Sequence, residues 1–178
     1  PSPPAIAVTG LEVAYDSVAV LKGIDLEVKT GERLLVVGGS GCGKSTLLKS
    51  IIGLNQPTAG VIRLLDRELA AQTETERKAL LRRIGVMFQY GALLNSLSVG
   101  DNVSLPLQMH TSLRTVEIEA LVQARLEMVG LGHAFALMPD QLSGGMRKRA
   151  ALARALALEP EILFCDEPGA GLDPVTAA

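Results

Sequence analysis

Residues 33–52 read RLLVVGGSGCGKSTLLKSII, a run that changes from apolar to glycine-rich and then to helical. The apolar part, Arg33 to Val37, has the composition of a strand that is buried on both faces. The last part, Lys44 to about Ile52, is helical in pattern, and Gly53 and Pro57 follow as stop signals. The loop between them fits the pattern G-x-x-x-x-G-K-[ST]. We therefore predict an α/β fold built around a phosphate-binding loop.

This glycine-rich loop has a physical reason to bind phosphate. Its glycines let successive backbone N–H groups turn toward an anion, and the helix that follows adds the positive end of its dipole. Lys44 is expected to reach the β- and γ-phosphates of a nucleotide, and the Ser45 hydroxyl to hold Mg²⁺. The alternative is a glycine-rich turn before an ordinary helix, but strand, loop and helix all agree with the nucleotide site. The residues predicted to line it are Gly38, Gly39, Ser40, Gly41, Cys42, Gly43, Lys44, Ser45 and Thr46.

A second candidate element is ILFCDE at residues 162–167, four apolar residues followed by two carboxylates. A parallel strand buried on both faces delivers its last residues to the ligand-binding edge of a sheet. Asp166 is then expected to bind Mg²⁺ through water, and Glu167 to accept a proton from an attacking water. Taken alone, such a strand end is more often simply solvated. Its combination with the glycine loop favours the catalytic interpretation.

The composition fits one globular domain. The chain has 178 residues, of which 48% are hydrophobic and 20% charged, so it can fill a core. Its longest apolar run has five residues, whereas a membrane span needs roughly 20, and Pro1 to Pro4 do not resemble a signal peptide. The net charge of −2 argues against nucleic acid as a partner.

The two cysteines, Cys42 and Cys165, are too far apart in sequence to suggest a disulfide framework or a metal cluster. Cys42 lies in the glycine loop, where it is either a small residue that fits or a thiol that bound nucleotide covers. Cys165 lies in the apolar run and is expected in the core. A reducing, cytosolic location fits this cysteine usage best.

The remaining pattern predicts the order of the other elements. Antiparallel strands are expected between Ile6 and Val28, with a turn at Asp16-Ser17, because apolar and charged residues alternate over residues 24–28. Further strands are expected at 61–65 and 84–88. Helices are expected from a capping box at residues 73–76 to about 83, and over 145–158. Residues 91–145 are predicted to form a mainly helical insert.

A third motif, LSGGM at residues 142–146, opens the last of these helices, 98 residues after Lys44. Ser-Gly-Gly alone is a common turn. Together with the glycine loop and the acidic strand, in this order, it makes the sequence resemble the ATP-binding cassette (ABC) family, whose signature is usually Leu-Ser-Gly-Gly-Gln. Met146 departs from the usual glutamine, and Gly39 stands where the family often has proline. The resemblance covers the whole chain, up to Gly171-Leu172-Asp173.

The resemblance implies a P-loop NTPase (RecA-like) core with an N-terminal antiparallel β subdomain and a helical insert. The chain would be a single incomplete ABC ATPase domain, with 1–90 and 146–178 as the core and 91–145 as the helical subdomain. Two copies would form a homodimer that sandwiches two ATP molecules head to tail. The Ser143 hydroxyl and the Gly144 and Gly145 amides of one copy would then face the γ-phosphate held by the other.

The resemblance also assigns roles to residues that the pattern alone leaves open. Tyr15 would stack on adenine, with Val20 packing nearby; otherwise the tyrosine covers a sheet edge. Gln89 would reach Mg²⁺ and the attacking water and sense a membrane partner, whereas a glutamine at a strand end is ordinarily exposed. Asp173 would link the two ATP sites, or else it is a turn residue before Pro174.

Two stretches, residues 88–99 and 142–153, are similar to the phospholipid-trafficking (Mla/Mce-type) branch of the family. They imply the ATP-hydrolysing subunit of a lipid transporter of the bacterial envelope. It would be held on the cytoplasmic face of the inner membrane by a multi-span permease. The alternatives are a cassette for another solute and a non-transport switch that regulates a partner by dimerising in response to ATP.

The sequence stops five residues after Asp173, before the place where the family has its switch histidine. His110 and His133 both precede the signature and match nothing around that switch. We therefore expect the 178 residues alone to bind nucleotide at most, to hydrolyse little or none, and to associate through an open sheet edge.

Overall fold

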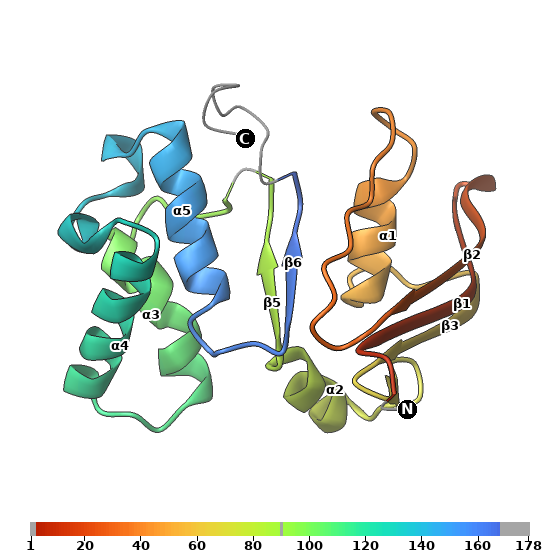
Figure 1. Cartoon of the computed structure of the whole chain (residues 1–178), viewed down its shortest axis with the longest axis horizontal. Helices are drawn as coiled ribbons and strands as arrows, with labels where there is room; N and C mark the ends of the chain where they lie inside the picture. The colour runs from red at the N-terminus through yellow and green to blue at the C-terminus, as the bar shows by residue number, and fades with distance from the viewer. Residues whose placement is uncertain (1–2, 90, 168–178) are drawn as a thin grey trace. The chain divides into compact units, whose positions relative to one another are not determined.

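The computed structural model describes residues 3–89 and 91–167. The chain divides into two compact units, residues 1–81 and 82–178, each with its own sheet (Figure 1). Among the described residues, no helix combines the length and the apolar character that crossing a membrane requires.

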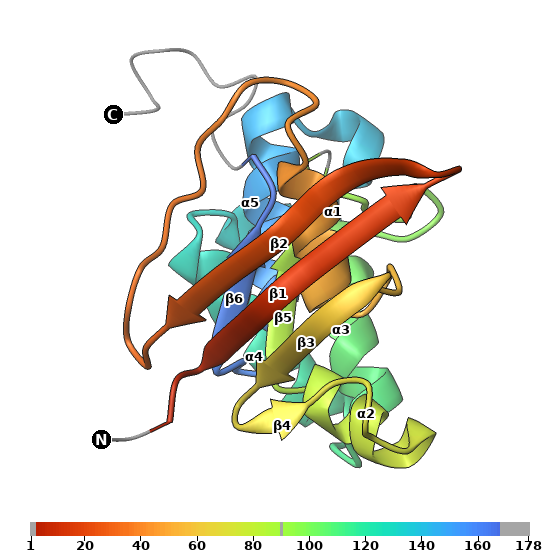
Figure 2. The same ribbon diagram turned by 90° about the vertical axis from the view of Figure 1, so that its right-hand side faces the viewer.

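The first unit contains a four-stranded sheet in the order β2-β1-β3-β4 (Figure 2). Every pairing in it is antiparallel, which confirms the antiparallel strands predicted near the N-terminus. Asp16 and Ser17 form the two-residue turn between the first two strands, and both have positive φ, as a type I′ hairpin turn requires. The strands are β1 (Ile6–Tyr15), β2 (Val18–Val28), β3 (Ala59–Leu64) and β4 (Arg67–Glu68).

A register shift in β1 keeps one face of this sheet apolar. Ile6 and Val8 are buried, and after an irregularity between Val8 and Leu11 the buried positions become Leu11 and Val13. Without the extra residue, the period of two would turn Leu11 to the solvent side. Gly10 has a φ of +56° within this irregularity, a conformation that glycine adopts at little cost.

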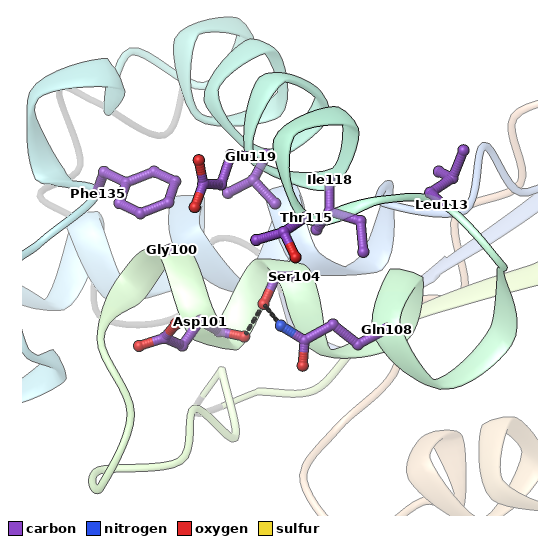
Figure 3. Close-up of a pocket in the computed structure, with 10 residues that line it drawn as sticks. Gly100, Asp101, Ser104, Gln108, Leu113, Thr115, Ile118, Glu119 and Phe135 are labelled. Carbon is purple, nitrogen blue, oxygen red and sulfur yellow. Dashed lines mark hydrogen bonds between the residues drawn. The ribbon is translucent and has the colours of Figure 1, made fainter.

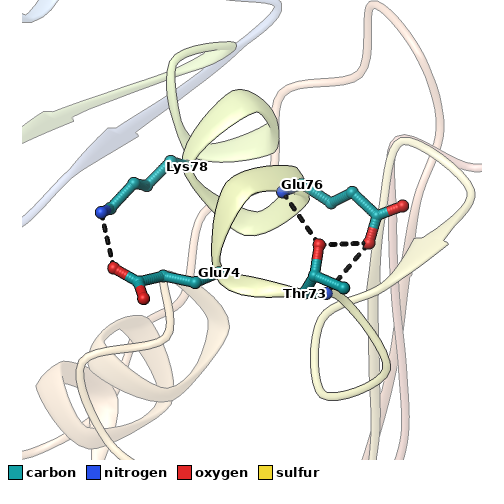
Figure 4. A network of polar contacts seen from close by, with 4 residues as sticks. All are labelled: Thr73, Glu74, Glu76 and Lys78. Atoms are coloured by element: carbon teal, nitrogen blue, oxygen red, sulfur yellow. Dashed lines mark hydrogen bonds and ion pairs between the residues drawn. The ribbon is translucent and has the colours of Figure 1, made fainter.

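Two helices complete the first unit: α1 (Lys44–Ile51) and α2 (Glu74–Leu81). The predicted capping box is confirmed, because Thr73 N donates to Glu76 Oε2 over 3.0 Å and Glu76 N donates to Thr73 Oγ1 over 3.3 Å (Figure 4). The hydrogen bonds from Thr73 also lower the pKa of the Glu76 carboxyl. Lys78 pairs with Glu74 one turn away on the same helix.

The strand predicted over Arg33 to Val37 is absent. Residues 32–39 have no regular secondary structure, and Leu35 and Val37 are 80% and 78% exposed. A run that is apolar on both faces becomes a strand only when other strands pair with its edges. Within 3–89 and 91–167, no strand pairs with it. The prediction of a strand here is therefore wrong for the described residues, because an apolar composition alone does not supply the neighbouring strands that a central strand needs.

The second unit pairs β5 with β6 in parallel, with Ile84 opposite Ile162 and Met87 opposite Cys165. The helical insert is confirmed as α3 and α4, which share an apolar core with α5. Val103, Val122, Leu126 and Ala150 in this core are fully buried. The elements are β5 (Ile84–Met87), α3 (Val99–His110), α4 (Thr115–Met128), the short helices η1 (Gly132–Ala134) and η2 (Pro139–Gln141), α5 (Gly144–Ala155) and β6 (Ile162–Cys165).

Strand β6 forms where it was predicted, but it is not buried on both faces. Ile162 is buried, whereas Leu163 is 39% exposed and Cys165 is exposed as well. The prediction that Cys165 belongs to the core is therefore wrong. In the described part of the chain β6 pairs with β5 alone, so its other edge and part of its surface stay open.

Candidate nucleotide-binding site

The glycine-rich loop has the backbone that its sequence requires. Gly41 and Gly43 have φ values of +77° and +100°, in the left-handed region that other residues rarely adopt. Gly43 is the N-cap of α1, and a Cβ added there would lie 2.9 Å from Leu21 Cδ2. A larger residue is therefore strained at this position by its backbone, and it would also require the Leu21 side chain to shift.

Lys44 directs its ammonium group back over the loop. Its Nζ donates to the carbonyl oxygens of Gly38 and Gly39 over 2.8 and 2.9 Å, and lies 3.8 Å from Cys42 Sγ. Because Gly43 has no side chain, no side-chain cap covers the first amides of α1. A positive charge and a helix N-terminus thus meet at one loop, which is the donor set that a phosphate group needs. Cys42 is exposed beside them.

Tyr15 and Val20 belong to the same unit as the loop. Tyr15 ends β1, is 46% exposed, and its hydroxyl accepts a 2.6 Å hydrogen bond from Asn55 Nδ2. Val20 Cγ1 would lie 3.4 Å from a Cβ at Gly43, so this side chain is next to the end of the loop. Asn55 was not foreseen, because nothing in its local pattern links it to a tyrosine 40 positions earlier.

Gln89 and Glu167 meet in the second unit. Since β5 and β6 are parallel neighbours, the residues that follow them emerge at the same edge of the sheet. Gln89 Nε2 donates to Glu167 Oε2 over 2.5 Å, and Asp166 N extends the ladder by donating to Met87 O over 2.8 Å. Gln89 is half-buried rather than exposed, so its alternative as an ordinary solvated glutamine does not apply.

Glu167 has an unusual backbone conformation. Its φ is +49°, which costs a residue with a side chain roughly 1–3 kcal/mol unless its surroundings hold it. Lys148 of α5 supports it by donating its Nζ to the Glu167 carbonyl over 3.3 Å. Desolvation raises the pKa of the Cys165 thiol, two residues before Glu167.

The signature residues form the start of α5. Ser143 is the N-cap, and its Oγ accepts a 3.2 Å hydrogen bond from Met146 N. Ser143 and Gly144 are exposed, while Met146 packs against the apolar core of the helical region. The residue that departs from the usual glutamine therefore serves the core, and the exposed helix N-terminus remains available to an anion.

Three basic residues, Arg147, Lys148 and Arg149, follow the signature on α5. Arg147 Nε donates to the Pro139 carbonyl over 2.9 Å, and Arg149 Nη1 donates to the Val129 carbonyl over 3.0 Å. With Lys148 on Glu167, each of the three cations holds a backbone carbonyl of another segment. The run therefore ties α5 to its neighbours.

The predicted site residues divide between the two units. Tyr15, Val20 and the loop through Thr46 lie in the first unit, and Gln89, the acidic pair and the signature lie in the second. Asp173 lies outside the described residues.

A separate pocket of about 370 Å³ lies in the helical region (Figure 3). Ser104 Oγ on its wall donates to the Asp101 carbonyl over 2.8 Å and accepts from Gln108 Nε2 over 2.9 Å. None of the predicted site residues lines it, so it is not part of the nucleotide site. Its lining consists of Gly100, Asp101, Ser104, Gln108, Leu113, Thr115, Ile118, Glu119, Val122 and Phe135.

The loop, the acidic strand end and the signature define an ATP-binding cassette. The chain belongs to the ABC transporter family, whose model matches residues 21–170.

Among curated proteins it is 42% identical over 174 residues to "Probable ribonucleotide transport ATP-binding protein mkl" of Mycobacterium leprae, covering 98% of this chain and 50% of that protein. It is also 42% identical over 167 residues to "Intermembrane phospholipid transport system ATP-binding protein MlaF" of Haemophilus influenzae, covering 94% of this chain and 61% of that protein. The chain thus spans about half to three fifths of the length of these relatives.

Solved structures of the family have the same fold. A dimeric ATP-binding cassette in a post-hydrolysis state, bound to ADP and Pi, superposes with a TM-score of 0.89 at 32% identity, covering 97% of this chain and 78% of that one. The structure of cbiO1 of Clostridium perfringens, part of the ABC transporter complex cbiONQ, superposes with a TM-score of 0.86 at 32% identity, covering 99% of this chain and 70% of that one. The predicted fold class, a P-loop NTPase core with an antiparallel β subdomain and a helical insert, is confirmed.

Proposed function

We propose that this chain is the ATP-binding and hydrolysing part of a membrane transporter. The observation that carries the proposal is the pair of prepared groups: Lys44 folded over a glycine loop, and Gln89 hydrogen-bonded to Glu167 at the end of two parallel strands. The first group suits a phosphate chain, and the second suits proton transfer from water.

The phosphates of ATP would be held by the loop residues Gly38 to Ser45, with Thr46 in the first turn of α1. Lys44 would exchange its carbonyl partners for phosphate oxygens, which are stronger acceptors for an ammonium group. Tyr15 would support the adenine ring, and the Asn55 hydrogen bond fixes the tyrosine ring in advance. Mg²⁺, when bound, neutralises phosphate charge, and Ser45, Gln89 and Asp166 are the residues proposed to hold it.

Glu167 would act as the general base for the attacking water. Its carboxylate is exposed, and the hydrogen bond from Gln89 Nε2 fixes one of its oxygens while the other can accept a proton. In the full-length protein, Ser143, Gly144 and Gly145 of a second copy would complete the site in a head-to-tail homodimer, and Asp173 would link the two sites. The exposure of Ser143 and Gly144 supports this dimer. Within each copy, residues 1–90 and 146–178 would form the core, and residues 91–145 the helical subdomain.

We propose phospholipid transport as the task of the complete transporter, because the MlaF relatives carry that name at 42% identity. The protein would then lie on the cytoplasmic face of the inner membrane, attached through a multi-span permease. Ribonucleotide transport is the second candidate, since the mkl relatives carry that name at the same identity.

We expect the full-length protein to co-purify with a multi-span permease, and the reconstituted pair to move a fluorescent phospholipid only with Mg-ATP. A complex with Lys44→Ala serves as the control for ATP-dependent movement. Transport of a labelled ribonucleotide instead would favour the second candidate. Purification without any membrane partner would contradict a transport role and favour the dimerising switch.

We also expect bound Mg-ATP to protect Cys42 from alkylation by at least about tenfold, because its exposed thiol lies at the loop that the phosphates would cover. Peptide mass spectrometry after a short iodoacetamide pulse measures this. A Cys42→Ser variant gives the background from Cys165, which is also exposed but is slowed by its raised pKa. Equal labelling of Cys42 with and without Mg-ATP would contradict its place at the site.

A further inference from the structure

Arg154 joins helix α5 to the segment that follows Gln89. Its Nη1 donates to the Ala92 carbonyl and its Nη2 to the Gly91 carbonyl, each over 2.8 Å. Two terminal nitrogens on two consecutive carbonyls use the planar fork that is particular to arginine. Burial lowers the pKa of this guanidinium, so its hydrogen bonds are made in a partly desolvated place.

Gly91 is itself held against α5 and closes the turn that contains Gln89. A Cβ at Gly91 would lie 3.3 Å from Ala151 Cβ and 3.3 Å from the Arg147 carbonyl, so the glycine permits a close approach to the helix. Its amide donates to the Phe88 carbonyl over 2.8 Å. The residue whose carbonyl accepts from Arg154 Nη2 is therefore also hydrogen-bonded to Phe88, the residue directly before Gln89.

The far end of the same segment is fixed from α3. Asn102 is fully buried, and its Nδ2 donates to the Leu94, Leu97 and Ser98 carbonyls over 2.9–3.1 Å. Its Oδ1 accepts from Leu94 N over 2.7 Å. Residues 91–98 are thus fastened to α3 at one end and to α5 at the other, and Arg154 supplies the side-chain connection to α5.

We propose that Arg154 is a positioning residue. It binds the segment that follows Gln89 to helix α5. In this way it couples α5, whose N-cap is Ser143, to the hydrogen bond between Gln89 and Glu167. The inference deepens the proposed function and rests on it in one respect, namely that Glu167 is the base whose position matters for turnover.

The test compares Arg154→Met with Arg149→Met in the full-length protein. Arg149 lies on the same helix and also donates to two consecutive carbonyls, those of Val129 and Gly130, and these two bonds lie away from the described residues that follow Gln89. We expect Arg154→Met to lower kcat for Mg-ATP at least about tenfold with the ATP affinity unchanged within about twofold, because misplacing a positioned group costs rate rather than ground-state binding. Arg149→Met is expected to change kcat less than about twofold by the same reasoning.

Two further measurements separate positioning from mere folding. The double variant Gln89→Ala/Arg154→Met should have a kcat within about twofold of that of Gln89→Ala alone, because a residue that acts through Gln89 has nothing left to position. Hydrogen exchange at residues 89–95 should speed up at least about tenfold in Arg154→Met and in Arg154→Lys, but not in Arg149→Met. Arg154→Lys keeps the charge without the fork, which makes it usable if the methionine variant folds poorly.

Additive losses of kcat in the double variant, or unchanged exchange at residues 89–95, would overturn the inference while leaving the proposed function intact. The proposed function itself fails under a different result, in which the parent protein does not hydrolyse Mg-ATP or Lys44→Ala hydrolyses it at the parent rate.

Discussion

Glu167→Gln is expected to lower the rate of ATP hydrolysis by about 10²–10⁴-fold in the full-length protein while ATP still binds. The amide keeps the shape of the side chain but cannot take a proton from water. Its oxygen can still accept the hydrogen bond from Gln89 Nε2, so the geometry at the end of β5 and β6 should persist. With hydrolysis blocked, the ATP-bound dimer should accumulate, which light scattering with and without Mg-ATP measures.

Glu161→Gln is the matched control for this variant. Glu161 is a second carboxylate beside β6, half-exposed and paired with Arg83 over 2.5 and 2.8 Å. Loss of such a surface pair costs at most about 1 kcal/mol, so turnover should stay near that of the parent. Hydrolysis at the parent rate by Glu167→Gln would move the base to another residue and leave the contact with Gln89 without a catalytic purpose.

Local patterns predicted the elements whose stability depends on near neighbours in sequence. The capping box at Thr73, the hairpin turn at Asp16-Ser17 and the helix after the glycine loop all form, because each is determined within a few residues. The contact between Gln89 and Glu167 was within reach as well, since the ends of parallel neighbouring strands share one edge.

The sequence was less informative where burial depends on distant partners. Leu35 and Val37 have the composition of a central strand and are largely exposed, and Cys165 lies in an apolar run without being buried. An apolar composition shows that a segment can be buried on both faces. Whether it is buried depends on the strands and helices that pack against it.

Arg154 and Asn102 were missed for a related reason. Each is a polar residue within an otherwise regular helix, and its partners are backbone groups, which leave no trace in the identity of the contacted residues. The available signal was a single cation within the Ala-rich run of α5. Such a residue in a packed helix face needs polar partners, because a buried guanidinium without them is costly.

Lys44→Ala is expected to weaken ATP binding at least about 100-fold, which removes detectable hydrolysis at ordinary nucleotide concentrations. A hydrogen bond to a charged group contributes about 1.5–3 kcal/mol, and the ammonium group would make such bonds to the phosphates. After its loss, the phosphate charge would face only backbone N–H groups and the dipole of α1. Calorimetry with Mg-ATP measures the affinity.

Lys49→Ala is the control that separates this specific contact from a general loss of positive charge. Lys49 lies in the last turn of the same helix and is exposed. Because a solvent-exposed charge away from the ligand is screened, its removal should change the affinity less than about twofold. An equal loss in the two variants would indicate unspecific attraction, and unchanged affinity in Lys44→Ala would place the phosphates elsewhere.

The contacts of Lys44 also indicate how much its removal should change the stability of the fold. Its ammonium group donates to the carbonyls of Gly38 and Gly39 and lies near Cys42 Sγ, all within the loop that contains it. Those carbonyls belong to exposed residues and can be hydrated when the lysine is removed. The free energy of unfolding should therefore fall by no more than about 1 kcal/mol. The backbone that turns the loop depends on Gly41 and Gly43, which the substitution leaves in place. A stable variant that no longer binds ATP would thus assign the loss to the missing charge rather than to a collapsed loop.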